Sequence, residues 1–227
     1  MKREFPTLAV VTALLLSFAL YEALVAAPTE QTMGNVQRIF YYHVPSAWTA
    51  FLLFLINFVA SVVYLARRSP KADILALVSA EVGVVFCTVV LITGPIWARP
   101  VWGIWWTWDL RLTLTLVLWL IYVSYLLLRR FSTGGKTPVI AAVVAIFGAL
   151  DVPLVYFSIW FFRTQHPSPV IGDNGSLDLR MAHVLLINWA AFLCLALLLC
   201  MTRYEIEIAQ RKVEEEQALQ SLMEGSR

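Results

Sequence analysis

Six long apolar stretches account for most of this 227-residue chain, and none of them contains Lys or Arg. A bilayer core about 30 Å thick needs roughly 20 apolar residues per helix. Only helices and closed barrels satisfy every backbone group in lipid, and these runs are too long and unbroken for barrel strands. The sequence therefore predicts an all-α, polytopic integral membrane protein with six transmembrane helices, at Thr7–Ala27, Pro45–Ala66, Ile74–Ile96, Leu112–Leu128, Val139–Phe162 and Met181–Met201.

The composition fits a lipid environment and excludes other classes of protein. Hydrophobic residues make up 60% of the chain and charged residues 14%, whereas a soluble domain carries roughly a quarter charged residues. The net charge of +2 provides no basic stripe, so no nucleic-acid partner is expected. Cys87, Cys194 and Cys200 lie in apolar runs without C-x-x-C spacing, and we interpret them as packing residues.

Lys and Arg are distributed unequally between the two sides of the predicted bundle. Twelve of the seventeen lie at the N-terminus, in the second and fourth loops and in the tail. The positive-inside rule then places the N-terminus and the C-terminus in the cytoplasm and the first, third and fifth loops outside. We expect a six-helix membrane domain at 1–202 and a charged, helical cytoplasmic tail at 203–227.

The third loop, at 97–113, is rich in tryptophan. Five of the nine tryptophans lie between positions 97 and 108, which is more than interfacial anchoring needs. Pro100 and Gly103 are expected to bend the backbone between them, so the loop is predicted to form a flat apolar shelf for a large planar ligand. Asp109 and Arg111 add one charge of each sign beside it.

The chain has three histidines, two of them predicted at the depth of this shelf. His43 shortly precedes a proline suited to the first turn of the second helix. His183 follows Asp178 and Ser176, either of which suits the N-cap of the sixth helix, whereas His166 lies in an outer loop. Two imidazoles beside flat aromatic side chains suit a haem iron, and outer arginines suit its propionates. Zinc is disfavoured, because no compact cluster of His, Cys and acidic residues is present.

Three acidic residues, Glu22, Glu81 and Asp151, lie inside predicted spans, where a charge is costly unless it is neutralised or paired. Asp151 precedes Pro153, where the helix is expected to kink. We interpret Asp151 as a structural residue, with a proton or solute path as the alternative. The chain contains no H-E-x-x-H, G-x-S-x-G or Walker A motif, so an enzyme is not predicted.

Several motifs together resemble one family. The segment W-G-x-W-W-x-W-D-x-R-L-T at 102–113 resembles the WWD motif of haem-handling proteins, in the form found in the CcmC branch of system I cytochrome c maturation. The segments H-V-P-S-A-W at 43–48, T-G-P-I-W at 93–97 and D-V-P-L-V-Y-F-S at 151–158, followed by R-T-Q-H at 163–166, are also similar to that family.

This resemblance implies a function in haem delivery and a set of site residues. It implies that haem b is bound as cargo at the periplasmic face of the bacterial inner membrane, with His43 and His183 on the iron. It also implies transfer to the membrane-anchored haem chaperone CcmE, together with the ABC transporter subunits CcmA and CcmB and the small membrane protein CcmD. The implied haem platform is Trp102, Trp105, Trp106, Trp108 and Asp109. The candidate propionate partners are Arg38, Arg99, Arg111, Arg163 and Arg180.

Two other functions remain open from the sequence. A membrane b-type cytochrome that transfers electrons usually ligates haem inside its bundle, whereas the histidines here are expected at one surface. A haem permease would use Glu81 and Asp151 to line a path through the membrane.

Overall fold

The computed structural model describes residues 4–132, 134–162, 164–167 and 177–225, and over these residues it contains helices and no strand. Six helical segments are long and apolar enough to cross a membrane, which confirms the predicted all-α, polytopic fold. The elements are α1 (Glu4–Tyr21), the π-helical turn η1 (Glu22–Ala26), the 3-10 turn η2 (Asn35–Ile39), α2 (Phe40–Arg67), α3 (Pro70–Trp102), α4 (Leu110–Phe131), α5 (Thr137–Ala149), α6 (Asp151–Phe161) and α7 (Leu179–Gly225).

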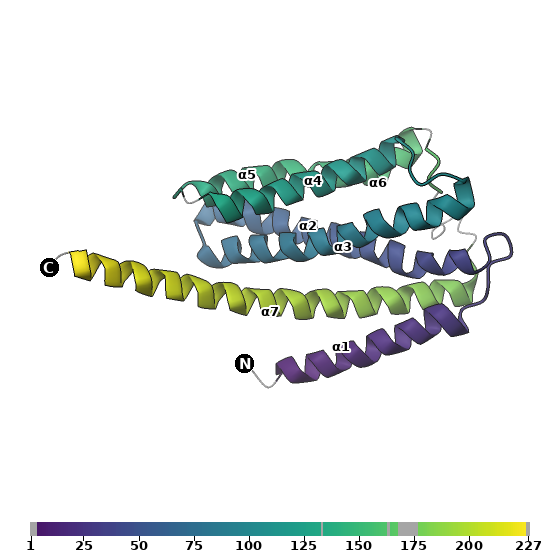
Figure 1. Ribbon diagram of the computed structural model, residues 1–227, viewed down its shortest axis with the longest axis horizontal. Helices are drawn as coiled ribbons and strands as arrows, with labels where there is room; N and C mark the ends of the chain where they lie inside the picture. Colours follow the sequence, from purple (N-terminus) through teal and green to yellow (C-terminus); the bar gives the residue numbers. More distant parts are fainter. Residues whose placement is uncertain (1–3, 133, 163, 168–176, 226–227) are drawn as a thin grey trace.

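The helix pair α2 and α3 lies in the middle of the bundle (Figure 1). On one side it packs against α4 and α5, and α6, which continues the crossing that α5 begins, packs on α4. On the other side it packs against α7, and α1 packs on α7 from outside. Both ends of the chain lie at the same end of the bundle, which we call the terminal end. The opposite end contains the α3–α4 connection and the starts of α2 and α7, and we call it the loop end.

Two central helices extend further towards the loop end than hydropathy predicts. α2 begins at Phe40, so Pro45 lies in its second turn and not in its first. α3 continues through the tryptophan-rich segment to Trp102 and ends at Gly103, whose φ of 78° is the left-handed conformation common after a helix. Hydropathy detects only the part of a helix that lipid surrounds, whereas a helix continues for as long as its backbone bonds are made.

The fifth crossing is broken close to Pro153, as the sequence predicts. α5 ends at Ala149 and α6 begins at Asp151. Pro153 therefore lies in the first turn of α6, where its missing N–H costs no helical hydrogen bond. The Asp151 carboxyl is buried at this break, and within the described residues one of its oxygens has no hydrogen-bond partner and no cation pairs with it.

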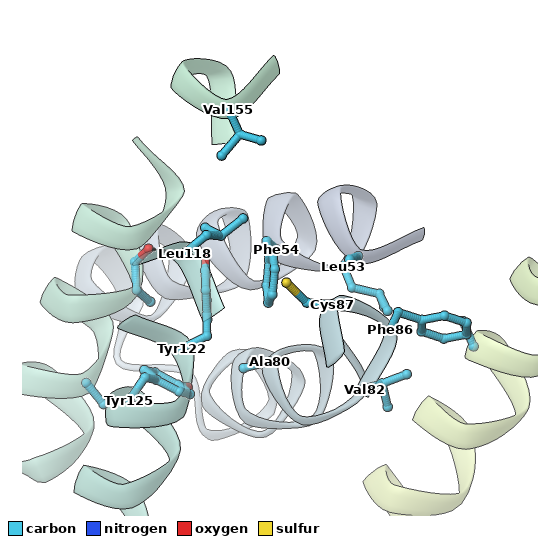
Figure 2. Packing of buried hydrophobic residues seen from close by; sticks show 14 residues of the cluster. Leu53, Phe54, Ala80, Val82, Phe86, Cys87, Leu118, Tyr122, Tyr125 and Val155 are labelled. Carbon is cyan, nitrogen blue, oxygen red and sulfur yellow. Dashed lines mark hydrogen bonds between the residues drawn. The ribbon is translucent and has the colours of Figure 1, made fainter. Parts of the chain in front are cut away.

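Small side chains on α3 let α2 approach closely. A Cβ at Gly83 would lie only 2.7 Å from the ring of Phe54, so this ring packs directly on the α3 backbone. The Phe54 ring also stacks on Tyr122 of α4, with 3.8 Å between ring centroids and 11° between planes (Figure 2). Ala80 and Cys87 lie one turn before and after Gly83 and belong to the same buried cluster. Close packing of this kind holds transmembrane helices together because lipid supplies no hydrophobic force between them.

A buried carboxylate joins three helices at the terminal end. Asp73 of α3 accepts hydrogen bonds from Arg129 of α4 at 2.6 and 2.9 Å and from Arg211 of α7 at 2.7 Å. The Asp73 and Arg129 side chains are only 5% and 9% exposed. Further along α3, Glu81 forms an ion pair with Arg203 of α7 at 2.8 Å. The glutamate that could have lined a path through the membrane therefore already has a cationic partner.

The predicted tail continues the last crossing without interruption. α7 is one helix from Leu179 to Gly225, so the expected boundary at 202 lies inside it. Arg203 and Arg211, which belong to this second half, bind α3 through Glu81 and Asp73. The first turns of the tail are thus anchored to the membrane bundle by charge and are not a detached extension.

The Asp73 cluster leads to a first prediction. Asp73→Asn should lower the free energy of unfolding by about 3–5 kcal/mol, because Arg129 and Arg211 are left without their buried carboxylate. The matched comparison is Glu81→Gln, whose ion pair is 28% and 31% exposed; it should cost less than Asp73→Asn, because the more exposed Arg203 side chain can turn towards the membrane surface once its partner is lost. Thermal unfolding followed by circular dichroism in detergent micelles measures both changes, and equal losses in the two variants would contradict the prediction.

Candidate functional site

The loop end of the bundle brings together parts of the chain that are far apart in sequence. These parts are the start of α2, the end of α3, the start of α4 and the segment 164–167 that follows α6. Only residues 103–109 lie between α3 and α4, so the predicted loop at 97–113 is shorter in the structure. Its two ends belong to the flanking helices.

His43 lies in the first turn of α2, half-buried, and its ring faces α3. Its Nδ1 atom lies 2.9 Å from the Oγ1 atom of Thr93. The charges that act on His43 come from Arg111 of α4 and from His166. The structure therefore places His43 at the loop end of the second crossing and surrounds it with groups from α3, α4 and the segment after α6.

The second imidazole at this place belongs to His166. Its Nδ1 atom lies 2.9 Å from the carbonyl oxygen of Pro167. A carbonyl oxygen can only accept, so Nδ1 carries the proton and Nε2 keeps its lone pair. Burial, and after it the charge of Arg111, lower the pKa of His166 to about 4. The ring is therefore neutral at pH 7 and can bind a metal through Nε2.

His183 lies on an exposed face of the first turns of α7. Asp178 caps this helix, because its Oδ1 accepts from the N–H groups of Arg180 at 2.8 Å and Met181 at 3.3 Å; the alternative cap, Ser176, lies outside the described residues. The His183 ring makes no hydrogen bond to the described part of the chain. Within that part it is His166, and not His183, that interacts with His43. The assignment of His183 to iron stays a prediction.

The tryptophans form two edge-to-face pairs and not one flat shelf. Trp97 and Trp102, both in α3, have ring centroids 5.2 Å apart and planes at 85°. Trp106 and Trp108, in the 103–109 connection, are 5.8 Å apart at 75°. Indole rings prefer this arrangement because the positive edge of one meets the negative face of the other. Trp105 and Trp108 are 58% and 76% exposed and offer ring faces to a ligand.

Two polar groups beside these rings have different roles. The Nε1 atom of Trp106 is buried, with no hydrogen-bond partner among the residues that the structure describes. Asp109 is instead the N-cap of α4: one carboxylate oxygen accepts from the Leu112 N–H at 3.1 Å and the other from the Thr107 hydroxyl at 3.1 Å. Asp109 thus shapes the end of the connection, while Trp106 has an unused donor.

The five outer arginines are not equivalent. Arg38 donates to the carbonyl oxygens of Ala23 and Ala27, and Arg99 donates to the carbonyl oxygen of Gly103, so both guanidinium groups hold helix ends. Arg180 is exposed at the start of α7, and Arg163 lies outside the described residues. The remaining one, Arg111, is half-buried beside His43 and His166, and its guanidinium makes no hydrogen bond within the described chain.

Together these groups suit an anionic, planar ligand that contains a metal. Among the described residues, His43 and His166 supply imidazole nitrogens, Arg111 a guanidinium that makes no hydrogen bond, and Trp106 an N–H without an acceptor. A metalloporphyrin with its propionates requires groups of these kinds. The sequence had marked His43 and Arg111, but it did not indicate that His166 lies beside them or that Thr93 contacts the His43 ring.

Comparison with known proteins shows the family of this chain. The family model of CcmC, heme exporter protein C, matches residues 1–219. Heme exporter protein C of Bradyrhizobium diazoefficiens is 35% identical over 96% of this chain and 84% of that protein. The same protein of Haemophilus influenzae is 31% identical over 89% and 84%. A ccmC-like mitochondrial protein of Marchantia polymorpha, named for cytochrome c biosynthesis, is 31% identical over 78% and 76%. The chain therefore belongs to the heme exporter protein C family.

Proposed function

We propose that this protein binds haem at the loop end of its bundle and presents it for transfer during the maturation of c-type cytochromes. The proposal rests on one observation. His43 and His166 lie near Arg111, whose guanidinium makes no hydrogen bond within the described chain, and exposed tryptophans lie at the same end of the bundle. The names of the relatives, which refer to heme export and to cytochrome c biosynthesis, point in the same direction. Haem b is cargo in this function and not a resident cofactor, and the protein binds and transfers it without acting as an enzyme.

In this proposal each group has a separate task. His43 binds the iron through Nε2, and a second histidine binds from another part of the chain. The electrostatic interaction between His43 and His166 supports His166 for the second position, with His183, predicted from the sequence, as the alternative to be tested. Arg111 pairs with a propionate, since charge-assisted bonds from a guanidinium to a carboxylate are strong and directional. The exposed faces of Trp105 and Trp108 cover the apolar macrocycle.

The proposed partners follow from the family and from the distribution of charge. Twelve of seventeen Lys and Arg residues belong to the terminal side, which supports cytoplasmic termini and a loop end that faces the periplasm across the bacterial inner membrane. Haem would then leave towards the membrane-anchored chaperone CcmE, with CcmA, CcmB and CcmD as the other components. A permease is disfavoured, because Glu81 is held by Arg203 and not free to line a path.

The histidine assignment gives a second prediction. His43→Ala and His166→Ala should each abolish the bis-histidine absorption spectrum of haem bound to the purified protein, whereas His183→Ala should keep it. Titration of haem into each variant in detergent, with equal amounts of monodisperse protein, measures the change. If His183→Ala loses the spectrum and His166→Ala keeps it, the second axial ligand is His183 and not His166. Full binding after the replacement of all three histidines would exclude axial histidine ligation altogether.

The role of Arg111 gives a third prediction. Arg111→Gln should weaken haem binding by about 10- to 100-fold, because a hydrogen bond to a charged group contributes about 1.5–3 kcal/mol. Arg180→Gln is the matched control, since this exposed arginine belongs to the same side of the bundle, and it should leave the affinity unchanged. Haem dimethyl ester, which lacks free carboxylates, should bind Arg111→Gln and the unaltered protein with equal affinity. A full loss of affinity for the ester as well would show that Arg111 acts on the fold and not on a propionate.

A further inference from the structure

Thr93 contacts the His43 ring from α3, and its hydroxyl group has three polar neighbours. The Oγ1 atom lies 2.7 Å from the carbonyl oxygen of Val89 and 3.4 Å from that of Val90 in the preceding turn, and 2.9 Å from Nδ1 of His43. A hydroxyl carries one proton and has lone pairs that accept. When this proton is donated to the Val89 carbonyl, as is common for Thr in a helix, the remaining contact requires that His43 donate from Nδ1.

The same helix contains a second threonine with this arrangement. The Oγ1 atom of Thr88 lies 2.7 Å from the carbonyl oxygen of Val84 and 2.8 Å from Nε1 of Trp119 on α4. An indole nitrogen can only donate, so here the direction of the bond is fixed: Thr88 donates to its own helix and accepts an N–H from a neighbouring one. Thr93 and His43 repeat this pattern close to the loop end.

We infer that Thr93 is a positioning residue for haem: it holds His43 in the tautomer with the proton on Nδ1, so that Nε2 presents its lone pair to the iron. The inference rests on the proposed function and adds a residue to it. A hydrogen bond from the far nitrogen of a ligating histidine fixes the ring and makes it a stronger donor to the metal. Gly94 lies beside the ring on the same helix, and a Cβ there would be in ordinary van der Waals contact with the Cε1 atom of His43, at 3.5 Å.

The other groups around His43 cannot replace Thr93. Arg111 carries only donors; the Nδ1 atom of His166 is already bonded to the Pro167 carbonyl, and its Nε2 atom is the one that would bind iron in the proposed function. Thr93 is therefore the acceptor that the described residues offer to the Nδ1 proton of His43. Without this acceptor, the neutral ring of His43 can carry its proton on either nitrogen. Part of the binding free energy of haem is then used to fix the tautomer and the orientation of the ring.

Three variants of the full-length protein test this role. Thr93→Val keeps the shape of the side chain and removes the acceptor; it should weaken haem binding by about 10- to 100-fold. The midpoint potential of the bound haem should rise, because a less basic imidazole stabilises ferric iron less. Thr93→Ser restores the hydroxyl and should restore both values. Thr88→Val removes the equivalent bond to Trp119 away from the site and should change neither the affinity nor the potential.

The outcomes separate this inference from the proposed function. Unaltered affinity and potential in Thr93→Val, with loss of haem in His43→Ala, would overturn the role of Thr93 alone. Full haem binding by His43→Ala would overturn the ligand assignment and the inference with it. A Thr93→Val variant that does not fold leaves a direct measurement on the unaltered protein: ¹⁵N-histidine NMR without haem, with the His43 signal identified by its absence in His43→Ala. A proton on Nδ1 supports the inference, and a proton on Nε2 overturns it.

Discussion

Lipid offers the peptide backbone no hydrogen bonds, so every N–H and C=O group inside the bilayer must be bonded within a helix. Polar groups that are still able to form hydrogen bonds therefore lie mainly where helices end. Here α3 ends at Gly103, Asp109 caps α4 and Asp178 caps α7, all at the loop end of the bundle. His43, in the first turn of α2, belongs to the same level. Because of this constraint, a site for a polar ligand can form at one end of the molecule without an opening through the crossings.

The geometry of the site depends on packing several turns away from it. His43 belongs to α2 and Thr93 to α3. The distance of 2.9 Å between Nδ1 of His43 and Oγ1 of Thr93 depends on how closely these two helices pack. The close approach is made at Gly83, where the Phe54 ring rests on the α3 backbone and stacks on Tyr122 behind it (Figure 2). At the terminal end, the carboxylate of Asp73 ties α4 and α7 to α3. The pair α2 and α3 is thus the frame on which the other helices and the site are held.

The number and type of the helices could be predicted because lipid-facing residues must be apolar over a fixed length. Local signals also held: Asp178 caps α7, and the fifth crossing breaks next to Pro153. Contacts between distant segments could not be predicted from spacing. The residues next to His166 in the sequence do not indicate that it lies beside His43. They also do not indicate that Arg38 and Arg99 bind carbonyl oxygens at helix ends while the Arg111 guanidinium makes no hydrogen bond within the described chain. The edge-to-face tryptophan pairs were missed for a related reason, because ring orientation depends on contacts between the rings themselves.

Under the proposed function, haem is held by two histidines and must later be released. Release is easier when one of the two histidines can leave the iron while the other stays in place. The two imidazoles that the structure brings together differ in this way. His43 lies on a long central helix, and its ring contacts a second helix through Thr93. His166 lies outside any helix, and among the described residues its ring is hydrogen-bonded to the carbonyl of the next residue alone, so displacing it breaks no hydrogen bond between the described helices. Under the proposed function, this asymmetry lets the His166 side open while α2, α3 and the Asp73 cluster stay packed, which is the order of events that release to a chaperone requires.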